Sequence, residues 1–269
     1  MTLPRIYLQL TTTPMTNIHE NGPEPRIVGG EEVDIKCFPF QVAILDIIGR
    51  LTCGGSIISP TYILTAAHCF DGLDNEPYVE VLIGSSDLRD YEGKLYNVSR
   101  YINHPKYNRY FDYDFSIVQL SSRLSYSETV QPIALPEYQE PEIVGSDAII
   151  SGYGLTKNPH DSPDPYYGRN SKLRAVTLSI VDRNDCNARL TGVYGGAYEV
   201  PENMLCAGAK RGKDACHGDD GGPLIIKTEK GPKLIGVFSF GYQCATFYYP
   251  AAFAKVSMVR NWIKQETGV

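Results

Sequence analysis

The sequence has no run of basic residues and no apolar run of about 18 residues, the length that a membrane-spanning helix needs. We therefore expect a soluble protein without a membrane partner. Its 25 Lys and Arg residues against 31 Asp and Glu residues give a net charge of −6, which argues against nucleic-acid binding as the main function. The 269 residues, with 25 glycines and 18 prolines, suit one large domain or two small ones rather than a coiled coil, collagen or a disordered chain.

The seven cysteines include no C-x-x-C pair, the spacing typical of zinc sites and thioredoxin-like redox centres. The five histidines show no metal-ligand spacing either, so we expect no metal and no other cofactor. Cysteines scattered through a loop-rich chain favour disulfides formed in an oxidising compartment, with buried free thiols in a cytosolic protein as the alternative. Because seven is odd, at least one cysteine has no partner within the chain.

The first 26 residues are polar and rich in threonine and proline, which is typical of a flexible pro-segment. Their short apolar stretch at residues 6–10 is interrupted by Gln9 and is poorer than secretion normally requires. The sequence therefore offers no convincing signal peptide: either an upstream signal precedes it, or export follows another route.

From residue 27 onward, short apolar runs alternate with turn residues, which is the pattern of strands. Only the C-terminal end reads as a helix, where Val256, Val259 and Ile263 share one face. Many strands and little helix indicate an all-β barrel or sandwich, and residues 131–145 could connect two halves. Examples of the segments expected as strands are 41–48, 62–66, 79–83, 116–120, 147–153, 172–180, 224–227 and 233–240.

Four motifs carry possible chemistry. Arg-Ile-Val-Gly-Gly at 26–30, Thr-Ala-Ala-His-Cys at 65–69 and Asp-Phe-Ser-Ile-Val at 114–118 could each be structural: a turn, a strand end and a loop before a core strand. Together with Asp-Ala-Cys-His-Gly-Asp-Asp-Gly-Gly-Pro-Leu at 214–224, in this order, their coincidence is implausible. From residue 27 to about 265, the chain resembles the trypsin/chymotrypsin family of serine peptidases.

The resemblance implies two six-stranded antiparallel β-barrels with an active site in the cleft between them. We expect the barrels at roughly 27–135 and 146–255 and a C-terminal helix at 256–266, after a pro-segment at 1–26. The family's disulfides fall on Cys53–Cys69, Cys186–Cys206 and Cys216–Cys244. Cys37 is left over, and we expect a buried thiol on a strand edge rather than an intermolecular bridge.

The resemblance also implies a mechanism of activation and catalysis. Cleavage after Arg26 would free the α-amino group of Ile27, which pairs with the carboxylate of Asp219 and orders the loop that follows. The backbone N–H groups of Gly218 and residue 220 would then form the oxyanion hole. His68 would take the proton of the nucleophile, and Asp114 would hold the tautomer of His68 and stabilise the imidazolium.

The nucleophilic serine of the family is absent, because the motif has Asp220 in its place. A carboxylate cannot repeat the work of the serine, and its charge opposes the oxyanion that must develop beside it. We therefore expect an inactive homologue, with His68 charged between Asp114 and Asp220 unless Asp220 turns to solvent. The segment Cys-Phe-Pro-Phe-Gln at 37–41 is similar to that of mite trypsin-like proteins and their inactivated paralogues.

The specificity pocket of the family maps onto Asp214 and onto two wall segments, 239–241 and 249–253. Asp214 stands where trypsin-like members hold the carboxylate that receives Arg and Lys side chains. The walls map onto Ser239, Phe240 and Gly241, with Gln243 and Ala251 in place of glycines. We expect a pocket that is trypsin-like in charge and narrowed in shape, because glycine allows the closest approach of a ligand.

Three further features bear on ligands and partners. The loop at 84–92 lacks the first acidic ligand of the family's calcium site, with Ser85 in its place, so we expect no calcium. Asn97 begins the sequon Asn-Val-Ser, an acceptor for a glycan if the protein is secreted. Many of the 19 tyrosines cluster near the expected cleft, where they either recognise proteins or pack against the barrels.

These observations lead to three hypotheses of function. The leading one is a secreted, monomeric pseudoprotease that binds proteins as a cofactor, decoy or competitor in an extracellular proteolytic cascade or in host defence. The alternative is an active Arg/Lys-specific serine endopeptidase whose serine is masked or substituted in the sequence as it stands. A storage or structural protein is the third, and no residue specifically supports it.

Overall fold

In the computed structural model, the described residues are 27–73, 79–90, 92–108, 110–163, 168–193, 199–208, 213–244 and 248–269. Their regular structure is mostly strand, and no helix among them is long and apolar enough to cross a membrane. The expected pro-segment at 1–26, Arg26 included, lies outside the described residues.

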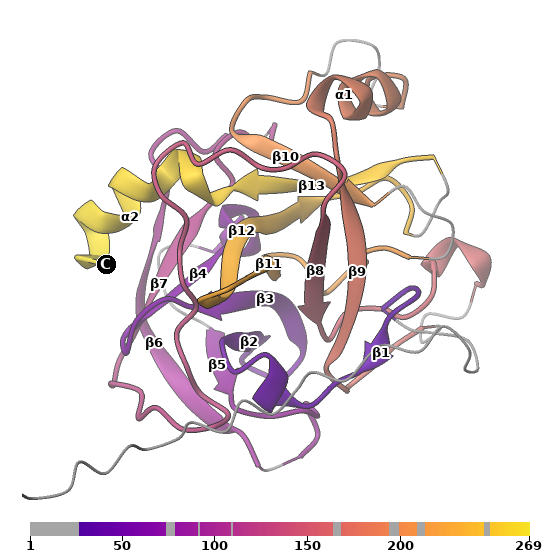
Figure 1. The fold of residues 1–269 in the computed structure, drawn as a ribbon. Coiled ribbons are helices and arrows are strands. Elements are labelled where there is room, and N and C mark those ends of the chain that lie inside the picture. Colours follow the sequence, from indigo (N-terminus) through magenta and orange to yellow (C-terminus); the bar gives the residue numbers. More distant parts are fainter. Residues whose placement is uncertain are drawn as a thin grey trace, which may run out of the picture.

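Two closed antiparallel β-barrels lie side by side and confirm the expected fold (Figure 1). In the first the strand order is β2-β3-β4-β7-β6-β5, and in the second it is β9-β10-β13-β12-β11-β8, closed by the pairing of β8 with β9. A short strand, β1 (Glu31–Glu32), adds to β9. The first barrel consists of β2 (Gln41–Asp46), β3 (Leu51–Ile57), β4 (Tyr62–Thr65), β5 (Val79–Ile83), β6 (Lys94–Asn103) and β7 (Ser116–Leu120). The second consists of β8 (Asp147–Gly152), β9 (Arg174–Val181), β10 (Met204–Gly208), β11 (Pro223–Thr228), β12 (Gly231–Phe240) and β13 (Pro250–Lys255).

Each barrel encloses an apolar core, because one face of every strand turns inward. Val42, Ile63 and Ile117 are fully buried in the first barrel, and Ile150 and Phe253 in the second. Burial of such side chains contributes roughly 25 cal/mol for each Å² of apolar surface removed from water. The barrels are thus rigid supports for the loops between them.

The segment between β7 and β8 crosses from one barrel to the other and touches both. The N–H of Ile133 donates to the carbonyl of Ile57 in the first barrel, and the N–H of Leu234 in the second donates to the carbonyl of Ala134. The connecting segment expected at 131–145 lies within this crossing.

The helices differ from expectation in two respects. The C-terminal helix begins as one 3₁₀ turn, η4 (Val256–Val259), before α2 (Arg260–Thr267), which packs on the first barrel through Ile263 (Figure 1). The expectation that only the C-terminus is helical is wrong, because α1 (Arg183–Thr191) follows β9. The carboxylate of Asp182 caps α1 by accepting the N–H groups of its first turn.

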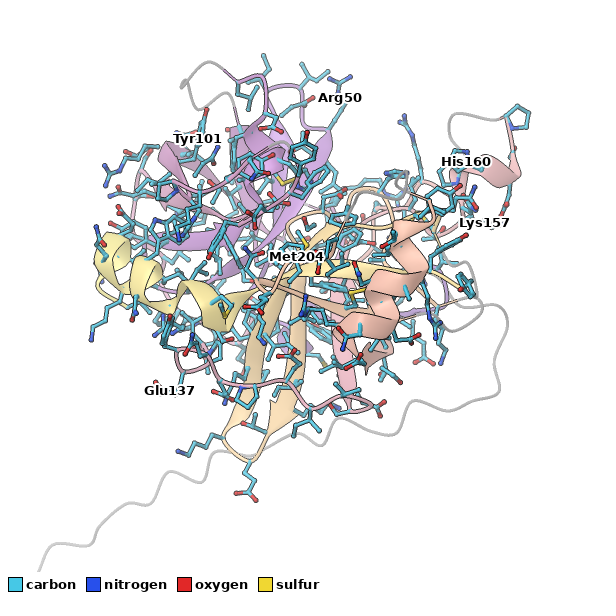
Figure 2. All side chains as sticks on the ribbon, turned by 90° about the horizontal axis from the view of Figure 1, so that it is seen from above. Arg50, Tyr101, Glu137, Lys157, His160 and Met204 are labelled. Atoms are coloured by element: carbon cyan, nitrogen blue, oxygen red, sulfur yellow. A yellow bond between two sulfur atoms is a disulfide. The ribbon has the colours of Figure 1, made fainter. Side chains whose placement is uncertain are left out.

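The three disulfides implied by the resemblance are present: Cys53–Cys69, Cys186–Cys206 and Cys216–Cys244 (yellow bonds in Figure 2). Among the described residues Cys37 is the cysteine left outside them. Its expected place is wrong: it ends the 3₁₀ turn η1 (Ile35–Cys37) rather than lying on a strand edge, and it is half-buried. The bond of its N–H to the Asp34 carbonyl forms part of this turn.

Candidate active site

A cavity of about 230 Å³ opens between the loops of the two barrels. The first barrel contributes the ring of His68, which stands in a 3₁₀ turn, η2 (Ala67–Phe70), just after β4. The second barrel contributes the loop before β11 and the end of β12. The cavity is lined by His68, Phe111 and residues 214–217, 220, 238–241, 243 and 244.

Asp114 is fully buried and holds His68 at two points. Its Oδ1 accepts the backbone N–H of His68 at 2.9 Å, and its Oδ2 lies 2.7 Å from the ring Nδ1. The hydroxyl of Ser239, on β12, donates to the same Oδ2 at 2.6 Å. This carboxylate therefore keeps a proton on Nδ1 and turns Nε2 toward the cavity.

Asp220 occupies the floor of the cavity on the other side of His68. Its Oδ1 lies 3.7 Å from His68 Nε2, and its Oδ2 accepts the N–H of Gly218 at 3.0 Å. The N–H group that the resemblance assigns to the oxyanion hole thus binds the chain's own carboxylate. The expected arrangement, with His68 between two carboxylates, is the one observed.

The pKa of His68 reflects this arrangement. Burial of the ring works to lower the pKa, but the hydrogen bonds and charges of Asp114 and Asp220 outweigh it and raise the pKa to about 10. The imidazole is therefore charged at neutral pH, whereas a general base must be neutral before it accepts a proton.

Main-chain hydrogen bonds fix the loop that carries Asp220. The carbonyl of Asp220 accepts the N–H of Gly54 from the first barrel at 2.6 Å. The N–H of Gly221 donates to the carbonyl of Phe238 in the second barrel at 2.8 Å. Gly221 has a φ of 74°, and a Cβ there would come within 2.1 Å of the Thr65 hydroxyl. Only glycine fits this position between the barrels.

Asp219, which precedes Asp220 in the same loop, is fully buried. Its two carboxylate oxygens accept the N–H groups of Gly154 at 2.9 Å and Cys216 at 3.0 Å. Burial raises the pKa of Asp219 to about 7, although these two hydrogen bonds work to lower it. Ile27, the first described residue, is fully buried in the apolar core of the second barrel.

Asp214 is buried at the end of the cavity, where the resemblance places the specificity carboxylate. Its Oδ1 accepts the N–H of Ala215 at 2.9 Å. Ser239, Phe240, Gly241 and Gln243 also line the cavity, as expected of pocket walls. Ala251 does not: it is buried in β13, paired with Ala207 of β10. Narrowing of the pocket by Gln243 and Ala251 stays a prediction.

Phe111 and His217 line the cavity although sequence reasoning did not name them for the site. Phe111 has a φ of 62°, unusual for an aromatic residue, and its ring meets His68 edge-on at 5.7 Å and Phe240 at 5.2 Å. His217 lies in the motif at 214–224, which was the available signal, and its side chain is exposed.

The remaining expected features lie away from the cleft. Asn97 is exposed on β6, opposite Glu80 of β5. In the loop at 84–92, the Ser85 hydroxyl donates to the carbonyl of Asp87, whose carboxylate pairs with Arg89. Of the tyrosine clusters, residues 166, 167, 194 and 198 lie outside the described residues. Arg50, labelled in Figure 2, ends the turn after β2 at the outer edge of the first barrel.

Comparison with known proteins gives a consistent result. The model of the family described as Trypsin matches residues 27–263. Trypsin 5G1 of Aedes aegypti is 37% identical over 246 residues, which cover 91% of this chain and 86% of that protein. Hypodermin-B of Hypoderma lineatum is 42% identical over 241 residues, covering 89% and 87%, respectively. A trypsin of Phaedon cochleariae is 32% identical over 274 residues, covering 100% and 98%.

These relatives correct the leading functional hypothesis. They are named as trypsins and a hypodermin, and none of them is named as an inactive or purely binding homologue. The expectation of a pseudoprotease that acts by protein binding in a cascade is therefore wrong. The alternative, a trypsin-like Arg/Lys-specific endopeptidase, fits the relatives better. Asp220 then stands in a peptidase site at the position where the family has its serine.

Proposed function

Because the chain belongs to the trypsin family, we propose that its function is proteolysis after arginine and lysine, with a serine as the nucleophile at position 220 in place of the Asp220 of the sequence as it stands (the serine form). The observation that carries this proposal is the buried carboxylate of Asp214, which lies in one cavity with the His68–Asp114 pair. A buried carboxylate attracts the cationic end of an Arg or Lys side chain. The preferred cleavage site follows from that charge.

In the serine form, each neighbouring group has a defined role. The serine hydroxyl attacks the substrate carbonyl while His68 Nε2 accepts its proton, and Asp114 stabilises the imidazolium that results. The Gly218 N–H, no longer bound by a carboxylate, donates to the oxyanion of the tetrahedral intermediate. His68 then protonates the leaving amine, and water releases the acyl group.

The same geometry indicates how Asp220 affects the catalytic groups. The carboxylate occupies the Gly218 N–H and keeps the His68 ring charged, so one of the two oxyanion donors and the general base are not available. We therefore expect turnover to be slow while residue 220 is aspartate. Turnover returns when residue 220 is serine, since the His68–Asp114 pair and Asp214 are in place.

Finer features of the biology are also proposals. We place a pro-segment at 1–26 and the peptidase domain at 27–269, with activation by cleavage between Arg26 and Ile27. The complete burial of Ile27 in the apolar core of the second barrel supports this activation. We further propose a secreted monomer that acts on extracellular protein substrates. The exposure of Asn97 supports a glycan there.

The test compares three cleaved proteins: the chain as it stands, Asp220→Ser, and Asp220→Ser with His68→Ala. Each is cut after Arg26 with immobilised trypsin, which is then removed. We expect Asp220→Ser to exceed the other two in kcat/KM for arginyl and lysyl peptides by at least about 10³-fold. A serine-directed phosphonate should label only proteins with both serine and His68.

Two further variants examine specificity. Asp214→Ser in the serine form should lose the preference for Arg and Lys, and Ala251→Gly should raise activity if its methyl group narrows the pocket. A correctly folded, cleaved Asp220→Ser protein without activity would refute the proposal. Equal cleavage by the Asp220 and serine forms would refute the role assigned to residue 220.

A further inference from the structure

The turn between β2 and β3 exposes two isoleucines. The N–H of Gly49 donates to the carbonyl of Asp46, so Ile47 and Ile48 are the two central residues of a β-turn. Their exposed fractions are 70% and 67%, among the largest of the apolar residues that the structure describes. Small and polar residues dominate such turns, and isoleucine gains nothing from burial here. The pair is therefore available for contact with an apolar group of another molecule.

Hydrogen bonds within the turn fix its shape. Asp46 Oδ1 accepts the N–H groups of Ile48 at 3.0 Å and Arg50 at 2.8 Å, and Asp46 Oδ2 accepts Arg50 Nε–H at 2.7 Å. The N–H of Asp46 donates to the carbonyl of Arg50, which is labelled in Figure 2. A surface that is ordered before binding loses less conformational entropy when a ligand contacts it.

The turn leads directly to the candidate active site. Leu51, the first residue of β3, lies against Gly218, where a Cβ would come within 3.2 Å of Leu51 Cδ2. Two residues further along β3, Cys53 forms its disulfide with Cys69, the neighbour of His68. The hairpin therefore borders the N–H group that we assign to the oxyanion of the serine form.

The position of Leu51 indicates which part of a substrate meets the hairpin. In the proposed reaction, the Arg or Lys side chain enters the cavity toward Asp214, whose walls include Phe111 and Phe240. The substrate chain before the cleaved bond therefore lies over this cavity. Leu51 is not among the described residues that line it, and borders Gly218 from outside. The part of the substrate that follows the bond extends past Gly218 toward Leu51 and the turn.

We propose that Ile47 and Ile48 bind an apolar side chain of the protein substrate within the first three residues after the cleaved bond. This inference rests on the proposed proteolysis and defines its substrates more closely. An extended chain spans at most about 3.3–3.6 Å for each residue, so three substrate residues cover about 10 Å. Ile48 precedes Leu51 by three residues, so their Cα atoms are separated by no more than about the same distance.

The charges of the turn favour an apolar substrate residue over a charged one. Asp46 and Arg50 form an ion pair with each other, at 2.7 Å, so the turn presents no uncompensated charge. The apolar surface of the two isoleucines is its main binding feature. Contact with an apolar side chain removes this surface from water, whereas contact with a charged side chain would desolvate the charge without a partner.

The first test measures peptide cleavage by the Asp220→Ser chain after cleavage at Arg26. Each peptide has the same residues up to arginine and three serines after it, and one serine at a time is replaced by leucine. We expect kcat/KM to be about five- to tenfold higher with leucine at one of these positions, the effect of half-burying its side chain. Changing both isoleucines together, by Ile47→Ser and Ile48→Ser, should abolish this gain. Serine suits a turn, so the fold should be kept.

The matched control changes another exposed apolar pair. Ile143 and Val144 are 73% and 54% exposed on the segment that crosses between the barrels. Ile143→Ser with Val144→Ser should retain the full preference for leucine. A preference that survives the change of both turn isoleucines, or is lost in this control, would overturn the proposal.

An arginyl anilide separates this inference from the proposed function, because it has no residue after the cleaved bond. Its hydrolysis by the serine form should be unchanged when both turn isoleucines are replaced. No anilide hydrolysis by the folded serine form would refute the proposed proteolysis. Normal anilide hydrolysis with equal kcat/KM for all the peptides would refute only the role of the turn.

Peptide binding to the cleaved Asp220 chain tests the same contact without turnover. Fluorescence anisotropy with labelled peptides should give a Kd about five- to tenfold lower for the preferred leucine peptide than for the all-serine peptide. Replacement of both turn isoleucines should remove this difference, and thermal melting shows whether the variant is folded. Equal affinity for the two peptides would overturn the proposal, whatever the activity of the serine form.

Discussion

The buried carboxyl group of Asp219 gives the stability of the chain a pH dependence that cleavage after Arg26 should remove. In the intact chain its pKa is about 7, raised from 3.8 by burial. The folded state therefore retains a proton that the unfolded state releases between these two pH values. The contribution of Asp219 to the free energy of unfolding is therefore greatest below about pH 3.8 and decreases as the pH rises to 7.

The size of the effect follows from the shift of the pKa. About three pKa units correspond to roughly 4 kcal/mol, at 1.36 kcal/mol for each unit. If cleavage activates the chain as we propose, the α-ammonium group of Ile27 pairs with Asp219 and stabilises its charged form. The pKa of Asp219 then falls to its ordinary value or below, and the loss of stability toward pH 7 disappears.

The measurement is the free energy of unfolding by urea between pH 4 and pH 7.5, for the intact and the cleaved chain. Other titrating groups, such as His104, are common to both forms and cancel in the difference. Asp219→Asn is the control, since its amide does not titrate and both forms should then depend on pH alike. Parallel curves for the intact and cleaved chains, with Asp219 present, would show that the ammonium group does not reach this carboxylate.

Three other predictions concern the support of the site. His104 is buried against Trp262, and burial lowers its pKa to about 4. In the Asp219→Asn chain, where the opposing titration of Asp219 is removed, the free energy of unfolding by urea should fall by about 3 kcal/mol from pH 6.5 to 4, and His104→Phe should abolish this loss. Gly152→Ala places a Cβ 2.2 Å from Asp219 Oδ1 and should cost about 1–3 kcal/mol in the same assay. Replacing the Cys216–Cys244 disulfide by two alanines should cost about 3 kcal/mol and speed hydrogen exchange in residues 218–222.

Short apolar runs bounded by turn residues predicted most strands, because buried strands are rich in branched and aromatic residues. For β5 and β7 the expected and observed bounds coincide. Strand β3 was not predicted, since it contains Gly54 and Gly55, which rarely favour strands. Their reason lies in the tertiary structure: a Cβ on Gly55 would come within 2.9 Å of Ile63, and one on Gly54 within 3.1 Å of Gly222.

Helix α1 escaped prediction because it has almost no apolar face. Only Cys186 and Leu190 are buried among its nine residues. Its supports are the Asp182 cap and the Cys186–Cys206 disulfide, neither of which produces a periodic pattern in the sequence. A short, polar helix of this kind is visible only once its partner strand is placed.

The motifs located His68, Asp114 and Asp220, but not how neighbouring groups bind them. The bond from Ser239 to Asp114 joins residues 125 positions apart and depends on how the barrels meet. The contact of the Gly218 N–H with Asp220 depends on the φ of 91° at Gly218, which the sequence permits but does not specify. Such contacts belong to the packing of loops rather than to any local pattern.

The loop that bears residue 220 is held by its main chain from both barrels, through Gly54 on one side and Phe238 on the other. These bonds involve no atom of the side chain at position 220. A change of that side chain therefore leaves the loop's supports intact. In evolutionary terms, a lineage can gain or lose catalysis by substitution at one position, while selection on the fold continues to act on the surrounding glycines.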